Sequence, residues 1–237
     1  EGELYWIANI NPESRCIDVS FRTSGRKALV LHADDGRIER VPCHEESGRT
    51  IVNLHFNPDD AQFILFSDDA PDVRETAGRP ETGYQTCVAG PWRVAFQPGR
   101  GAPSETVMDR LSLWNDSAEP GIRYFSGTAT YTAGFGSDGE PCILDLGEVY
   151  NMARVFVNGR DMGLLWKKPF RVDISDAVKD GTNELRIEVT NTWHNRIIGD
   201  LQPGVKERIS YTCYDFYKED SPLYDSGLKG PVMVCGR

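Results

Sequence analysis

The sequence lacks the features of a membrane protein and of a nucleic-acid-binding protein. Its apolar runs are short, as at residues 63–66, whereas about 18 uninterrupted apolar residues are needed to cross a bilayer. Basic residues number 26 against 36 acidic ones, which gives a net charge of −10. Because an acidic surface repels phosphate groups, we expect no membrane span and no nucleic-acid partner.

Motifs for catalysis and metal binding are also missing. The four histidines show no H-E-x-x-H spacing, the six cysteines form no C-x-x-C pair, and no G-x-S-x-G elbow occurs. No pattern places two of the 36 carboxylates across a cleft, as glycoside hydrolysis requires. We therefore expect no catalytic residue, no metal site and no cofactor, and we favour free thiols over disulfides.

Short strands with polar turns dominate what is present. Residues 15–22, 50–56 and 184–190 alternate apolar and polar side chains, which predicts strands with one buried face. Asn158-Gly159 is a strong hairpin signal between two such runs. Strands spaced by 8–12 residues, without a long helix, predict an all-β protein of antiparallel sandwiches.

The composition changes at residues 68–86, which are polar and contain no alternating apolar run. This stretch reads as a linker. We accordingly expect a small antiparallel β-sandwich at 1–67 and a second β domain at 87–237. The chain begins with Glu1 rather than Met, so we also expect it to be a processed chain or a piece of a longer protein.

The best candidate for a binding surface is the cluster at residues 191–196. Trp193 is an aromatic ring that can stack on a sugar, and Asn195 and Arg196 can form forked hydrogen bonds to vicinal hydroxyls. Trp166 and Asn158 are secondary candidates near predicted strand ends. Two alternatives remain open: the tryptophans cap a core, or the cluster fixes a loop or an interdomain contact.

An ordered series of motifs runs through the second part of the chain: FSGTATY at 125–131, LDLGEV at 144–149, ARVFVNGRDMG at 153–163, LWKKPFRVDIS at 165–175 and GTNEL at 181–185. The series resembles the galactose-binding-like jelly roll attached to family 2 glycosidases. TNTWHNRIIGD at 190–200 and SGLKGPV at 226–232 resemble the C-terminal part of bacterial alpha-L-rhamnosidase-like enzymes of glycoside hydrolase family 106. Residue Lys229 departs from the apolar residue usual there, and residues 1–67 match the preceding small sandwich less specifically.

The resemblance implies a role in secreted bacterial polysaccharide degradation, in the periplasm or outside the cell. The catalytic carboxylates of such enzymes lie on an upstream (β/α)₈ barrel, which needs about 250 residues that this chain does not have. We therefore predict a non-catalytic, C-terminal accessory piece of a glycoside hydrolase. Its partners would be carbohydrate and the upstream catalytic domain of the same polypeptide.

The binding residues predicted for that role are Trp193, Asn195, Arg196, Trp166 and Asn158. Jelly rolls of this kind sometimes carry a structural calcium ion, but no residue pattern signals one here. The alternative is a structural module that braces neighbouring domains and binds no sugar of its own. A third interpretation, a self-sufficient small glycosidase, predicts turnover of an aryl glycoside by this chain alone.

Overall fold

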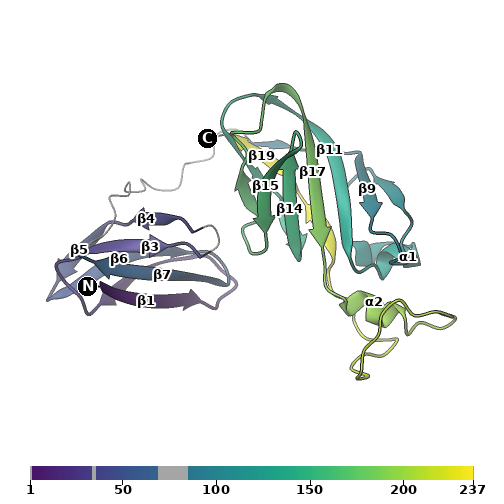
Figure 1. The fold of residues 1–237 in the computed structure, drawn as a ribbon, viewed down its shortest axis with the longest axis horizontal. Helices are drawn as coiled ribbons and strands as arrows, with labels where there is room; N and C mark the ends of the chain where they lie inside the picture. The colour runs from purple at the N-terminus through teal and green to yellow at the C-terminus, as the bar shows by residue number, and fades with distance from the viewer. Residues whose placement is uncertain (1, 34–35, 69–84, 237) are drawn as a thin grey trace. The chain divides into compact units, whose positions relative to one another are not determined.

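A computed structural model describes residues 2–33, 36–68 and 85–236 of the chain. The chain divides into two compact units, residues 1–80 and 81–237, and both are built from antiparallel strands (Figure 1). The predicted all-β fold, with two β-sandwiches of which the second is a jelly roll, is confirmed. Across the described ranges, no helix has the length and apolar character that a membrane crossing requires.

The first unit is a sandwich of two sheets. One sheet has the strand order β1 (Gly2–Asn9), β7 (Asp60–Ser67), β3 (Lys27–Leu31) and β4 (Ile38–Arg40). The other has the order β2 (Arg15–Phe21), β6 (Arg49–Phe56) and β5 (Cys43–Glu46). Their facing side chains form one core, which includes Phe21, Val30, Leu54, Phe56 and Phe66.

The second unit packs a six-stranded sheet against a four-stranded one. The larger sheet has the order β10 (Glu105–Met108), β9 (Trp92–Phe96), β11 (Thr128–Asp138), β17 (Asp180–Thr190), β14 (Met152–Val157) and β15 (Arg160–Leu165). The smaller has the order β16 (Arg171–Asp173), β12 (Cys142–Asp145), β19 (Met233–Gly236) and β8 (Gln85–Cys87). Strands β13 (Glu148–Tyr150) and β18 (Gly227–Gly230) pair with each other in a separate two-stranded antiparallel sheet.

A hydrogen-bonded aromatic pair lies in the core of the second unit. The indole of Trp114, in the 3₁₀ turn Trp114–Asp116, donates to the hydroxyl of Tyr131 at 2.6 Å. The backbone N–H of Leu228 donates to the same oxygen at 3.2 Å. Burial raises the pKa of the Tyr131 phenol, so this hydroxyl stays neutral and can accept both bonds.

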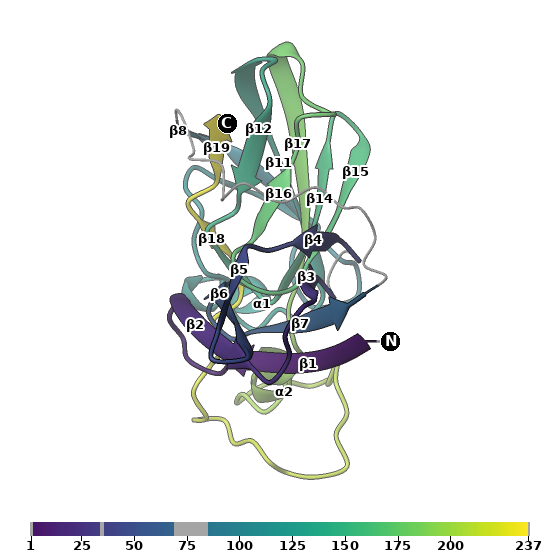
Figure 2. The same cartoon turned by 90° about the vertical axis from the view of Figure 1, so that its left-hand side faces the viewer.

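Helical structure is short and lies outside the sheets. Helix α1 (Pro120–Arg123) precedes β11, and helix α2 (His194–Gly199) follows β17. Residues 201–226, between α2 and β18, contain no strand. They extend beyond the end of the sandwich in both views (Figures 1 and 2). We call this segment the aromatic loop.

Most of the predicted linker at 68–86 lies outside the described residues, which end at 68 and resume at 85. Residues 85 and 86 belong to the edge strand β8, because they pair with strand β19 in the register Cys235↔Gln85 and Val234↔Thr86. All six cysteines are free thiols.

Candidate functional site

The three leading candidate residues lie at the start of helix α2, and only Trp193 reaches the surface. Trp193 immediately precedes α2 and is 43% exposed. The guanidinium of Arg100 lies 4.4 Å from the centre of its indole ring. One face of the indole is therefore occupied by a cation–π contact, while the rest of the ring is accessible to a ligand.

Asn195 is only 2% exposed, and the protein itself uses its amide group. Its nitrogen donates to the carbonyl oxygen of Tyr224 at 2.7 Å and to the hydroxyl of Ser226 at 3.3 Å. Its oxygen accepts the backbone N–H of Tyr224 at 2.8 Å. Both ends of the amide thus bind the C-terminal end of the aromatic loop.

Arg196 is also buried, and it forms an ion pair with Asp200 one turn further along the helix. The side-chain Nε lies 3.0 Å from Oδ1 of Asp200, as a close contact rather than an aligned hydrogen bond. The other carboxylate oxygen of Asp200 accepts the backbone N–H groups of Ile209 and Ser210, at 3.0 and 2.6 Å, and the Ser210 hydroxyl at 2.7 Å. This network holds the middle of the aromatic loop.

His194 adds further contacts at the C-terminal end of the loop that Asn195 also holds. Its Nε2 lies 2.9 Å from the carbonyl oxygen of Pro222, so this nitrogen must carry the proton and donate it. The imidazole ring stacks on Tyr224 with ring centres 3.5 Å apart and meets Tyr217 edge-on. Together with Asn195 and Asp200, His194 makes α2 a clamp for the aromatic loop.

The loop held by this clamp presents aromatic rings to solvent. Tyr211 is 92% exposed, and the centres of the neighbouring Tyr214 and Phe216 rings lie 5.6 Å apart. Four large aromatic side chains of the loop are exposed: Tyr211, Tyr214, Phe216 and Tyr224. Sequence reasoning did not select these residues, although their density in a stretch without strand periodicity was a usable signal.

Trp166 follows strand β15 and is exposed, with the ammonium of Lys167 6.0 Å from its ring centre. The strand register pairs Leu165 with Ala153, and Ala153 in turn with Val189. Trp166 therefore lies at the same end of the six-stranded sheet as α2 and Trp193.

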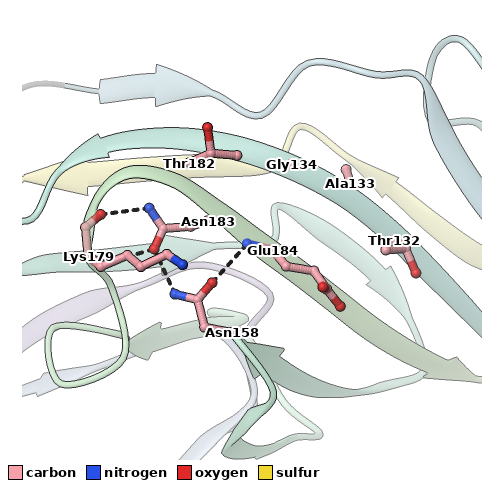
Figure 3. A pocket seen from close by; sticks show the side chains of 8 residues that line it. All are labelled: Thr132, Ala133, Gly134, Asn158, Lys179, Thr182, Asn183 and Glu184. Carbon is pink, nitrogen blue, oxygen red and sulfur yellow. Dashed lines mark hydrogen bonds between the residues drawn. The ribbon is translucent and has the colours of Figure 1, made fainter.

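Asn158 lies towards the opposite end of that sheet, at the tip of the β14–β15 hairpin. Its nitrogen donates to the Ala177 carbonyl at 2.9 Å. It also donates to Oδ1 of Asn183 at 2.7 Å, and its oxygen accepts the Glu184 N–H at 3.0 Å (Figure 3). It borders an open groove of about 570 Å³ that Lys179, Thr182 and Glu184 also line. Since Glu184 is six residues from the end of β17, about 20 Å separate this groove from α2.

Two carboxylates of the second unit have lowered pKa values. The Lys229 ammonium lowers the pKa of Glu148, and the Arg154 guanidinium lowers that of Asp161. Within the described ranges, no group of three or more His, Cys, Asp or Glu side chains is arranged to hold a metal ion.

Comparisons with known proteins relate the chain to glycoside hydrolases. The solved structure of a rhamnosidase from Novosphingobium sp. PP1Y is 40% identical and superposes over 99% of this chain with a TM-score of 0.84. A curated protein of Formosa agariphila, named "Putative beta-glucuronidase", is 28% identical over 94% of this chain. The chain spans only 23% and 22% of the lengths of these two proteins. No family model matches the chain.

These similarities confirm the relationship that the motif series predicted. The chain corresponds over nearly its whole length to a segment of a rhamnosidase, and its relatives are glycoside hydrolases.

Proposed function

We propose that this chain is a non-catalytic accessory region of a larger, alpha-L-rhamnosidase-like glycoside hydrolase and that it contacts carbohydrate through the aromatic loop. The observation that carries the proposal is the exposure of four aromatic rings on a loop that His194, Asn195 and Asp200 hold at its middle and at its C-terminal end. The 40% identity to a rhamnosidase segment supports the enzyme class. Catalysis would belong to an upstream domain of the same polypeptide, and the site of action would be the periplasm or the cell exterior.

Ring stacking is the physical basis of recognition in this proposal. A pyranose presents an apolar C–H face that packs on the flat face of a tyrosine or phenylalanine, while its hydroxyls remain hydrated or bind nearby polar groups. Because α2 fixes the loop, less conformational entropy is lost when the sugar binds. Trp193 and Trp166 would extend the stacking surface at this end of the sheet. Asn195 and Arg196 are positioning residues, since both are buried.

The second candidate is a bracing module that binds no sugar. It is favoured by the internal hydrogen bonds and contacts of Asn158, Asn195 and Arg196, which are those of residues that stabilise loops. In this alternative the exposed rings of the aromatic loop pack against a neighbouring protein region. The two candidates share the clamp and differ in what the rings contact.

Calorimetry with rhamnose, galactose and plant or host polysaccharides tests the proposal. Tyr211→Ala and Phe216→Ala should each weaken binding about 3- to 10-fold, because an aromatic contact contributes about 0.5–1.5 kcal/mol. The matched control is Val107→Ala, which alters an exposed apolar residue on strand β10 and should change nothing. An absence of heat with every glycan would favour bracing, and turnover of an aryl glycoside by this chain would refute the non-catalytic assignment.

A further inference from the structure

One sheet of the first unit is apolar on both faces. The register aligns Leu4 with Leu65 and Leu65 with Leu29, and it aligns Trp6 with Phe63. These positions alternate with the core residues of the same strands, so their side chains lie on the opposite side of the sheet from the core. We call this side the outer apolar face; its large members that reach the surface are Leu4, Trp6, Leu31, Ile38, Phe63 and Leu65, whereas Leu29 at its centre is fully buried.

The other sheet of the same sandwich has a polar outer side, as expected for a sheet face in contact with water. On its outer side the amide of Asn53 donates to Asp18 at 2.7 Å, and the guanidinium of Arg49 donates to the hydroxyl of Ser20 at 2.6 Å. By contrast, the outer apolar face exposes 64% of Trp6. An antiparallel sheet that faces water normally carries polar side chains there, so an apolar outer face indicates a surface that is covered when the protein works.

Charge on this face indicates the kind of partner. The outward positions of its four strands include Lys27 and Arg40 and no carboxylate, in a chain whose net charge is −10. A second copy of the chain would bring the same two cations and no anion to the contact. Strand lengths and spacings limit the face to at most roughly 400–500 Å², and its accessible area is smaller because Leu29 is fully buried. Even the upper value is below the roughly 800 Å² per partner of a stable complex.

We propose that the outer apolar face docks onto a folded region of the same larger polypeptide, at an apolar surface bordered by carboxylates. This inference rests on the proposed function only in requiring that larger polypeptide. About three quarters of the length of the related rhamnosidase lies outside the segment that this chain matches. A covalently linked partner has a high effective concentration, so a face of this size is sufficient to hold it.

Hydroxyl-radical footprinting of the complete polypeptide and of the 237-residue chain tests the inference. Oxidation of Trp6 should be at least about 5-fold slower in the complete polypeptide, and oxidation of His55, on the solvated sheet, should be the same in both. Equal oxidation of Trp6 would overturn the inference, as would a reading frame that adds no folded region. Protection of Trp6 that rises with the concentration of the 237-residue chain would identify a second copy as the occupant and would also overturn it.

A pair of matched variants adds a second measurement. Leu4 is 59% exposed and Val107, on an unrelated strand of the second unit, is 62% exposed. Leu4→Glu should restore rapid oxidation of Trp6 in the complete polypeptide, because docking would then have to bury a carboxylate, and the face would stay undocked. Val107→Glu should leave the oxidation of Trp6 unchanged. Neither variant alters the aromatic loop, so sugar binding measured on the 237-residue chain is a separate result. Failure of that binding would leave the docking inference intact.

Discussion

Replacement of Asn195 by alanine should release the aromatic loop while the sandwich stays folded. The substitution removes three hydrogen bonds, two of them to the backbone of Tyr224 and one to the hydroxyl of Ser226. A typical hydrogen bond contributes about 1 kcal/mol net, so we expect a local loss of roughly 2–3 kcal/mol. At 1.4 kcal/mol for each factor of ten, the open form of the loop should become about 30- to 150-fold more populated.

Hydrogen–deuterium exchange measures this directly at the backbone amide of Tyr224, which should exchange faster by that factor. Thr192→Ala, a change at an exposed residue just before α2, is the control and should leave the exchange unchanged. If the Tyr224 amide of the Asn195→Ala variant exchanged at the wild-type rate, Asn195 would not be holding the loop and the clamp would be refuted. Loss of sugar binding with unchanged exchange would instead mean that Asn195 contacts the sugar itself, as the sequence first indicated.

Two further predictions concern the second unit. Tyr131→Phe leaves the buried N–H groups of Trp114 and Leu228 without their acceptor, so it should cost about 2–4 kcal/mol and lower the Tm by roughly 5–15 °C in a circular-dichroism melt; a loss below about 1 kcal/mol would contradict this account. The pKa of Glu148 is lowered by Lys229, so the stabilisation from this pair is present above the ordinary carboxyl pKa and is lost as pH falls through the lowered one. Glu148→Gln should therefore lower the urea midpoint slightly at pH 7 and not at about pH 3, and an equal difference at both would show that charge is not the cause.

The strands that sequence reasoning predicted best are those whose signal is local. The alternation at 15–22, 50–56 and 184–190 corresponds to β2, β6 and β17, and Asn158-Gly159 forms the turn between β14 and β15. Strand β8 was not predictable in this way, because it has only three residues and they do not alternate apolar and polar side chains. It is a strand because the edge of β19, about 150 residues later, supplies its partner.

The same distinction applies to the site. Most of the polar side chains in the motif at 190–200 have specific partners in the structure. Their partners, however, lie elsewhere in the chain: Asn195 binds Tyr224 and Ser226, and Asp200 binds Ser210. A polar residue next to an exposed tryptophan looks the same in sequence whether it faces a ligand or a loop. Only tertiary structure tells which of the two it contacts.

The energetics of the clamp indicate why this loop is held at all. Burial of the Arg196–Asp200 pair has a desolvation cost, and a buried ion pair of this kind can often be replaced by apolar side chains without loss of stability. The pair is therefore weak evidence for a contribution to folding. What it does achieve is a fixed backbone at Ser210, next to the almost fully exposed ring of Tyr211. If the loop contacts carbohydrate as proposed, this buried polar network would hold the Tyr211 ring in position for a ligand.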